Sequence, residues 1–144
     1  MLLVDTNVLI YAVNASSPHH DASRTWLLDE LQSGTDVVGL PWVSLLGFIR
    51  ISTHPRILEH PLTPEEAMSV VHAWFNHPRV VTPEPSPRHA ALLAGLLANS
   101  GTAGNLTNDA HLAALALELD ATMVTFDRDF ARFGVRVLVP GQAG

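Results

Sequence analysis

The sequence predicts an α/β fold in which helices cover both faces of a mainly parallel sheet. Short apolar runs of strand type alternate along the chain with longer segments whose apolar residues recur at helical spacing, and glycine, proline or polar residues separate them. The chain has 144 residues and shows no internal repeat or segment of biased composition. We therefore expect a single domain over residues 1–144.

The alternation continues through the whole chain. The expected strands cover residues 2–4, 36–41, 79–85, 121–126 and 135–139. The expected helices cover residues 8–13, 19–34, 42–53, 64–76, 87–101, 108–120 and 127–133. Thr6 or Asn7 is expected to cap the first helix, while Thr63, Pro64 and Glu66 match the N-cap, first-turn proline and capping-box acid of the fourth.

Composition limits the functions available. The formal net charge is −6, from 14 acidic residues against 8 basic residues, and every basic residue is an arginine. This balance argues against a protein that coats duplex nucleic acid through a broad basic face, but it permits a nuclease with an acidic, metal-binding centre. The chain has no cysteine, signal-peptide pattern or run of membrane-spanning length, so we expect a cytoplasmic protein.

Three aspartates occupy positions where α/β proteins bind ligands. Asp5 directly follows the first expected strand. Asp127 directly follows the fourth, with Thr125 two residues earlier on the same side of an extended chain. Asp109 lies at the start of a helix that has almost no other charge. Because ligands bind at the carboxyl ends of parallel strands, these acids carry more weight than acids elsewhere.

Each of these aspartates also has a structural explanation. An aspartate at an N-cap or in the first turn of a helix stabilises that helix, and this alternative stays open for each residue taken singly. Three carboxylates at one sheet edge repel one another unless a cation lies between them, however. Mg²⁺ binds carboxylate oxygens and keeps water ligands for a reaction, so the combination favours a divalent metal centre.

Four stretches resemble a known family. VDTNVLI at residues 4–10, NDAHLAALALEL at 108–119 and TFDRDFARF at 125–133 resemble the three signatures of PIN-domain ribonucleases, in particular the VapC toxins of bacterial toxin–antitoxin pairs. LPWVSLLGFIRISTHPRI at 40–57 resembles a VapC subgroup common in actinobacteria. The resemblance spans nearly the whole chain in the expected order. It implies a PIN-like three-layer α/β/α fold with a mainly parallel, twisted sheet.

The resemblance also implies roles for individual residues. The family's metal-binding and catalytic acids match Asp5, Asp109 and Asp127. Asn7 matches a supporting polar residue, and Thr125 one that helps to shape the pocket. Asp129 matches an acid that lies near the site more often than it binds the metal directly. The implied cofactor is Mg²⁺ or Mn²⁺.

One position departs from the family. Many PIN domains carry a glutamate where this chain has Gly47, and no acid occurs between Asp36 and Glu59. Three carboxylates favour one well-held ion over a permanent pair. Glu84 also follows a strand end, but nothing in its spacing requires a role at the site.

The chemistry implied is the hydrolysis of an RNA phosphodiester. A divalent ion would lower the pKa of a water, orient it for in-line attack and offset charge on the phosphoryl oxygens, without a covalent enzyme intermediate. Arg50 lies three residues beyond Gly47. It is expected either to dock RNA or to pair with the acidic cluster, and both alternatives stay open.

The resemblance further implies two protein partners. VapC proteins are typically homodimers, and an apolar content of 47% fits a self-association surface beyond the core. A cognate VapB-like antitoxin is expected to lay its tail in a hydrophobic groove and to place a basic side chain at the acids.

Three rival functions remain to be compared with the metal-dependent endoribonuclease. The first is a catalytically weak PIN-like module that binds an antitoxin or RNA. A metal-dependent phosphatase is disfavoured because the first strand ends in DTN rather than in paired acids. A zinc hydrolase is disfavoured because no histidines show HExxH spacing. His111, two residues after Asp109, is expected to pack or to face a partner rather than to bind metal.

Overall fold

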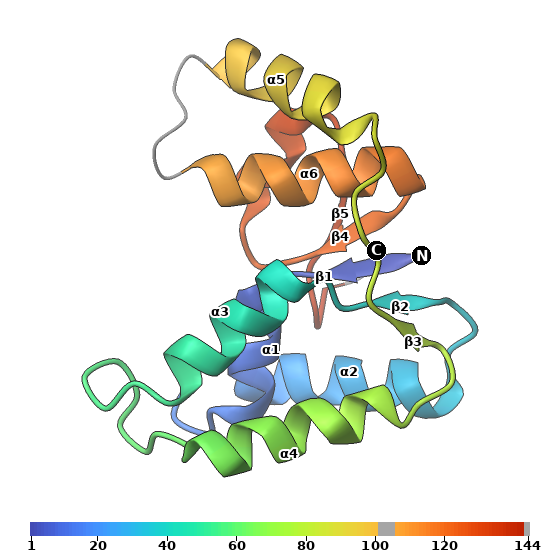
Figure 1. The fold of residues 1–144 in the computed structure, drawn as a ribbon. Coiled ribbons are helices and arrows are strands. Elements are labelled where there is room, and N and C mark those ends of the chain that lie inside the picture. The colour runs from blue at the N-terminus through green and yellow to red at the C-terminus, as the bar shows by residue number, and fades with distance from the viewer. Residues whose placement is uncertain (101–105, 143–144) are drawn as a thin grey trace.

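The centre of the molecule is a parallel sheet. The computed structural model describes residues 1–100 and 106–142, and in these ranges five strands are ordered β3-β2-β1-β4-β5 with every neighbouring pair parallel (Figure 1). The strands are β1 (Leu2–Val4), β2 (Val38–Gly39), β3 (Val80–Val81), β4 (Thr122–Val124) and β5 (Arg136–Leu138). The central strand β1 therefore ends between the ends of β2 and β4.

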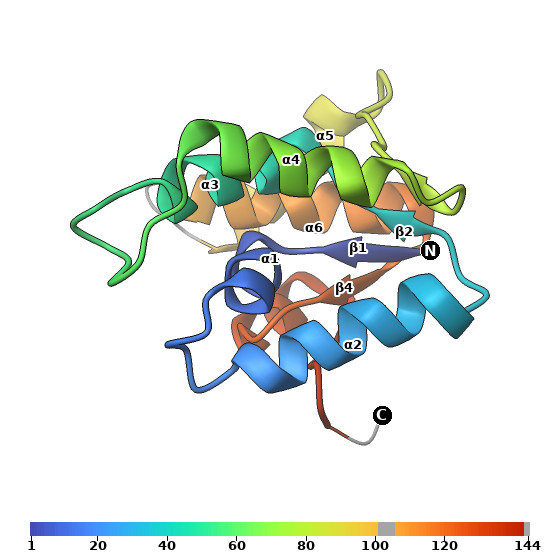
Figure 2. The same ribbon diagram turned by 90° about the horizontal axis from the view of Figure 1, so that it is seen from below.

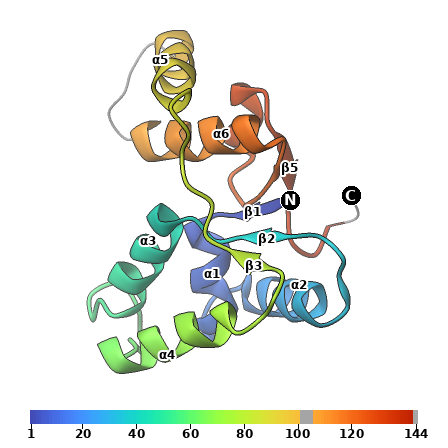
Figure 3. The ribbon, with the colours of Figure 1, turned by 45° about the vertical axis from the view of Figure 1, so that its right-hand side comes forward.

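Helices cover both faces of this sheet. They are α1 (Thr6–Val13), α2 (His20–Ser33), α3 (Trp42–Ser52), α4 (Pro64–Phe75), α5 (His89–Ser100), α6 (Thr107–Leu119) and the 3₁₀-helix η2 (Arg128–Phe133). Helices α1 to α4 pack on one face, and α5, α6 and η2 on the other, as the views in Figures 1 and 3 show. The three-layer α/β/α architecture expected from the sequence is confirmed.

The strand β1 shows why the two layers form. Leu2 and Val4 belong to the apolar cluster on the side of α1 to α4, whereas Leu3 belongs to the cluster on the side of α6. Successive side chains of a strand point to opposite faces, so a short strand that is apolar at every position must be covered on both sides. Figure 2 shows β1 crossing between α2 and α6.

Most expected elements are present, with local corrections. Strands β2 and β3 are shorter than the predicted 36–41 and 79–85, since prolines at 41, 83 and 85 donate no hydrogen bond to a ladder. The segment 127–133 forms a 3₁₀-helix. Gly101, the expected end of α5, lies outside the described residues. Within the described ranges, every helix is too short or too polar to cross a bilayer.

The helix N-termini include one wrong prediction and one that is confirmed. The cap of α1 is Asp5, and neither Thr6 nor Asn7 takes that role. Helix α1 begins at Thr6, directly after the strand turn, so the last residue before it is the one with capping geometry. The capping box of α4 is present as predicted: the Thr63 hydroxyl accepts from the Glu66 backbone N–H at 3.1 Å, and the Glu66 carboxylate accepts from the Thr63 backbone N–H at 3.0 Å.

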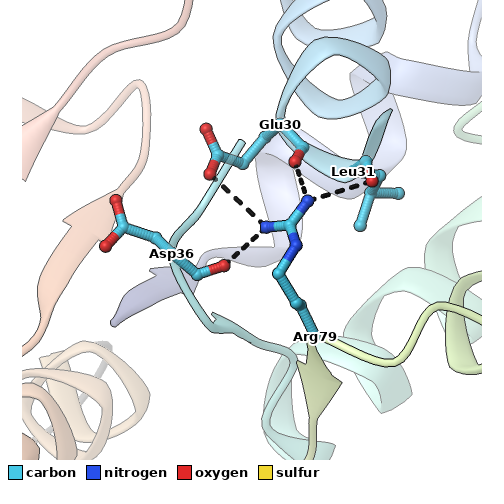
Figure 4. A network of polar contacts seen from close by, with 4 residues as sticks. All are labelled: Glu30, Leu31, Asp36 and Arg79. Atoms are coloured by element: carbon cyan, nitrogen blue, oxygen red, sulfur yellow. Dashed lines mark hydrogen bonds and ion pairs between the residues drawn. The ribbon is translucent and has the colours of Figure 1, made fainter. Parts of the chain in front are cut away.

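Arg79 connects the β3 edge of the sheet to α2 through hydrogen bonds and an ion pair. Arg79 lies immediately before β3, and its guanidinium donates to the backbone carbonyls of Glu30, of Leu31 at 3.0 Å and of Asp36 at 2.6 Å (Figure 4). It also forms an ion pair with the Glu30 carboxylate at 3.8 Å. The last carbonyls of a helix have no partner inside the helix, so Arg79 satisfies the carbonyl of Leu31 and shares that of Glu30 with the Gly34 backbone N–H, which donates to it at 3.0 Å.

Candidate active site

Asp5 combines a structural role with a position at the sheet edge. It follows β1 and is only 8% exposed. Its Oδ1 accepts from the Thr6 backbone N–H at 2.7 Å, which is the capping contact of α1, and its Oδ2 accepts from the Thr125 hydroxyl at 2.8 Å. Both carboxylate oxygens are thus held in fixed directions while each keeps a further lone pair for another ligand.

Thr125 connects the polar residues of the site. Its fully buried hydroxyl donates to Asp5 and accepts from the Asp127 backbone N–H at 3.0 Å and from Asn7 Nδ2 at 3.4 Å. The Asn7 side-chain oxygen in turn accepts from the Phe126 backbone N–H at 3.4 Å. These bonds join the end of β1 to the segment that follows β4, because β1 and β4 are parallel neighbours.

The segment after β4 supplies two more acids. Asp127 caps η2, and its Oδ1 accepts from the Asp129 backbone N–H at 2.9 Å. Its side chain lines the same pocket as Asp5. Asp129 is exposed and does not line that pocket, although its charge acts on Asp109.

Asp109 approaches from a different element, the first turn of α6. It lines, together with Asp5 and Asp127, a pocket of about 520 Å³. The structure therefore brings the three aspartates singled out from the sequence to one cavity. Each also occupies the structural position considered as its alternative, as a cap or in a first turn, so the two explanations do not exclude each other.

The other walls of the pocket were not foreseen from the sequence. They are apolar, and their residues are Ile10, Tyr11, Ile51, Ile57 and Leu58. Tyr11 lies four residues after Asn7 on α1, so helical spacing was a usable signal for it. Ile57 and Leu58 lie between α3 and α4, where no periodic pattern predicts which way a side chain points.

Burial and mutual repulsion disfavour the charged form of two of these carboxyls. Desolvation, followed by the negative charges of Asp5 and Asp127, raises the pKa of Asp109 from its ordinary 3.8 to about 6, although Arg132 acts in the opposite direction. Desolvation also raises the pKa of Asp5, against the lowering effect of its hydrogen bonds from Thr125 and Thr6. A cation placed among these groups would remove the repulsion.

The donor set fits a hard divalent cation. Carboxylate oxygens are the preferred protein ligands of Mg²⁺ and Mn²⁺. In residues 1–100 and 106–142, no group of three or more His, Asp or Glu side chains lies close enough together to hold a metal ion by itself. Mg²⁺ is commonly bound through one or two carboxylates and several waters, so the residues present fit an ion that takes its other ligands from water or substrate.

The arginine whose charge acts on the acids is Arg132 and not Arg50, the arginine expected from the sequence. Arg50 lies in the last turn of α3, is exposed and does not line the pocket. It forms no ion pair with any residue that the structure describes. Arg132 of η2 is instead the cation whose charge acts on Asp109, and its guanidinium lies 5.2 Å from the centre of the Phe133 ring.

The structure leaves no room for a side chain at Gly47, the position where the resemblance places an additional glutamate in many PIN domains. A Cβ atom at Gly47 would lie 2.7 Å from Thr6 Oγ1 and 2.9 Å from Thr6 Cγ2. The Thr6 hydroxyl donates to the Ser44 carbonyl at 3.2 Å, which holds it against α3. Since contacts below 3 Å are not tolerated, no side chain fits at residue 47 while Thr6 keeps this place.

His111 packs between α5 and α6. Its Nδ1 lies 2.9 Å from Nε2 of His89, and the two rings meet edge to face with centres 4.7 Å apart. Desolvation, with a smaller effect from His89, lowers the pKa of His111. Neither histidine lines the pocket with the three aspartates.

We expect Mg²⁺ to raise the melting temperature less at acid pH than at neutral pH. In the metal-free protein, folded Asp109 keeps its proton up to about pH 6, whereas the unfolded chain loses it near 3.8. The folded state thus binds more protons in this window, and its stability falls as the pH rises through it. A divalent ion held by Asp109 would have to displace that proton, so the rise in melting temperature on adding Mg²⁺ is expected to be largest above pH 7 and small at pH 5. The lowered pKa of His111 makes stability rise with pH, but this effect is the same with and without Mg²⁺ and cancels when the two melting temperatures are compared at each pH. A rise in melting temperature with Mg²⁺ that is equal at every pH would contradict the expectation.

Comparison with known proteins identifies the family. The model of the PIN domain matches residues 2–135. A relative named Ribonuclease VapC37, from Mycobacterium tuberculosis, is 50% identical over 137 residues and is matched over 94% of both chains. Ribonuclease VapC33 of the same species is 40% identical over 133 residues, with 92% of both chains covered.

Solved structures show the same fold at lower identity. A chain of VapBC2 from Rickettsia felis, bound to a DNA fragment from their promoter, superposes with a TM-score of 0.69 at 20% identity, covering 96% of this chain and 98% of the other. A chain of VapBC from Salmonella typhimurium, also bound to DNA, has a TM-score of 0.63 at 21% identity, with 96% of both chains covered. The present chain belongs to the PIN-domain family, as a member of the VapC type.

Proposed function

We propose that this chain, as one PIN domain over residues 1–144, is an endoribonuclease that requires Mg²⁺ or Mn²⁺. The observation that carries the proposal is the convergence of Asp5, Asp109 and Asp127 on one pocket at the carboxyl ends of β1 and β4. The names of the relatives, which are ribonucleases at 40% to 50% identity, support the same reaction class.

The side chains would share the work as follows. Asp5 and Asp109 would hold the ion, and Asp127 would hold it directly or through water. The hydrogen bonds of Thr125 and Asn7 hold Asp5 at a fixed position relative to the segment 125–127. A bound divalent ion activates water and offsets the charge that develops on the phosphoryl oxygens. Arg132, which lies near Asp109, adds positive charge for the RNA backbone.

The test is cleavage of total cellular RNA by the purified chain. We expect cleavage with Mg²⁺ or Mn²⁺, its loss in EDTA, and its return when Mg²⁺ is added in excess. Asp5→Asn should lose cleavage and remain folded, because its single side-chain oxygen can still accept from the Thr6 backbone N–H that caps α1, whereas the bond from the Thr125 hydroxyl is lost. Absence of cleavage by folded wild type with either ion, across a broad RNA pool, would overturn the proposal.

A second candidate is the weakly catalytic binding module, and the packing at Gly47 favours it. The Thr6 side chain fills the place where a fourth carboxylate would enter, so this chain has fewer acidic ligands than many PIN domains. The cleavage assay separates the two functions. Tight binding of RNA or antitoxin without turnover would support the module.

The same pocket suits an inhibitory antitoxin. Its three carboxylates attract a basic side chain, and Ile51, Ile57 and Leu58 provide an apolar wall for the segment that carries it. We propose a VapB-like antitoxin as this partner. Co-expression with the product of the adjacent reading frame should give a complex that does not cleave RNA, and a complex with full activity would contradict this assignment.

A homodimer is the second proposed assembly. Trp42 and Leu46 are 44% and 60% exposed and lie one turn apart on α3. Trp42 lines a pocket with Val81 of the edge strand β3, which is 38% exposed. Apolar side chains gathered this way are typical of an interface. We expect light scattering after gel filtration to give the dimer mass for wild type and the monomer mass for Leu46→Arg.

A further inference from the structure

The pocket at the acids continues along one side of α1. Asn7, Tyr11 and Asn14 are spaced four and three residues apart, so they lie on one face of this helix, and all three line the pocket. Tyr11 lies six positions after the N-cap Asp5, which corresponds to about 9 Å along the helix axis. The cavity of about 520 Å³ therefore has an acidic end and an aromatic side.

The Tyr11 ring is held in place by neighbouring rings. Its centre lies 5.4 Å from that of Phe126, at an interplanar angle of 68°, and 5.1 Å from that of His19. The centres of His19 and Phe126 are themselves 4.4 Å apart. The Tyr11 carbonyl lies 2.8 Å from Nδ1 of His20, which ties the end of α1 to the start of α2. Tyr11 is therefore oriented before any ligand binds.

This aromatic cluster is joined to the acidic end of the pocket. Phe126 lies between Thr125 and Asp127 in the chain, and its backbone N–H donates to Asn7 at 3.4 Å. A ligand that spans the pocket thus meets carboxylates, and any ion they hold, at one end and a fixed aromatic ring at the other.

Because the protein is acidic overall, an aromatic ring is a suitable contact for an RNA strand. At −6 the protein offers no general attraction to a polyanion, so an RNA strand must be held by local contacts. Unpaired bases are commonly bound by stacking on aromatic side chains, which depends little on ionic attraction. A pocket of this volume has room for a small-molecule ligand of nucleotide size.

We propose that Tyr11 forms a nucleobase-binding subsite for the nucleotide next to the cleaved phosphodiester. This inference rests on the proposed ribonuclease function. Phe126 and His19 act as positioning residues for the Tyr11 ring. Asn14 Oδ1 accepts from the Ser16 backbone N–H at 3.2 Å, and its side-chain nitrogen donates to no residue that the structure describes. Because Asn14 lines the pocket, that nitrogen is available to donate to an acceptor on the base edge.

The test measures base-dependent binding of RNA. Fluorescence anisotropy would follow a fluorescein-labelled, single-stranded RNA of random sequence, with an abasic strand of equal length beside it. Both would be measured on Asp5→Asn protein, which does not cleave. Adding Tyr11→Leu should raise the Kd for intact RNA about tenfold or more. The Kd for the abasic strand should not change, and Tyr11→Phe should bind as tightly as tyrosine.

A matched control removes a different aromatic ring. Trp26 lies half-buried on α2 in another pocket, which also contains the carboxylates of Asp21 and Asp29. Trp26→Leu should leave the Kd for RNA unchanged. Melting temperatures of all variants would show that they are folded, and a Tyr11→Leu protein that is unfolded would be replaced by Phe126→Leu, which displaces the ring indirectly.

The outcomes separate this inference from the proposed function. Cleavage by wild type together with an unchanged Kd in folded Tyr11→Leu overturns the base subsite and leaves the ribonuclease intact. Equal loss of binding for intact and abasic RNA also overturns it. Base-dependent binding through Tyr11 without any cleavage by wild type supports a base-binding site at Tyr11, but it overturns the ribonuclease and with it the position of that site beside a cleaved phosphodiester.

Discussion

Asp109→Asn is expected to abolish RNA cleavage and, at the same time, to raise the melting temperature of the metal-free protein. The carboxylate of Asp109 is disfavoured by burial and by the charges of Asp5 and Asp127, so its replacement by a neutral amide relieves repulsion. Under the proposed function the same change also removes a metal ligand, so we expect kcat to fall by about 100-fold or more. Steady-state cleavage and thermal melts in EDTA measure the two effects.

Asp129→Asn is the matched control for this prediction. Asp129 is exposed and lies outside the pocket, although it is in the same acidic region. It should change cleavage and melting temperature little. An Asp109→Asn protein that melts lower than wild type in EDTA would contradict the role of repulsion, and one that cleaves normally would contradict the role of Asp109 as a ligand.

Gly47→Ala is expected to lower the free energy of unfolding. The new Cβ would lie 2.7 Å from Thr6 Oγ1 and 2.9 Å from Thr6 Cγ2 at the contact of α1 with α3. Overpacking of this kind costs about 1–3 kcal/mol, and the helix preference of alanine over glycine offsets about 1 kcal/mol of it. Urea unfolding of wild type and variant measures the net loss.

Thr6→Ala provides the partner variant in a double-mutant cycle. It removes both Thr6 atoms that lie within 3 Å of the added Cβ. Gly47→Ala should therefore be neutral or stabilising in the Thr6→Ala background. Equal losses in both backgrounds would show that the Thr6 contact does not set the cost. The same packing predicts that Gly47→Glu fails to restore a fourth acidic ligand unless Thr6 is also shortened.

The strand ends explain why much of the candidate site was predictable. Asp5 follows a run that is apolar at every position, and Asp127 follows the largely apolar run 121–126. A polar residue directly after a strand of this kind lies at a sheet edge, and this identified both aspartates. Thr125 followed from the two-residue repeat of a strand. The start of an otherwise uncharged helix identified Asp109. These signals are local, so they can be read from the sequence without knowledge of the strand order.

The remaining features depend on contacts between distant segments. Nothing in chain order indicates that β1 lies between β2 and β4. The approach of Thr6 to Gly47 arises because α1 and α3 pack together, and the charge of Arg132 reaches Asp109 only because η2 lies beside α6. The sequence offered Thr6 or Asn7 as the cap of α1 and Asp5 as an alternative, since all three residue types are good caps, and the structure selects Asp5 because α1 begins at Thr6.

The most direct test of the metal-dependent centre is a Mn²⁺ titration of metal-free protein in which bound Mn²⁺ and RNA cleavage are measured in the same samples. Wild type should begin to cleave RNA as Mn²⁺ binds, with both signals saturating together, and Asp5→Asn should lose both. Cleavage that persists in metal-free wild type, or in Asp5→Asn with no bound Mn²⁺, would contradict a reaction that depends on a metal held by these aspartates.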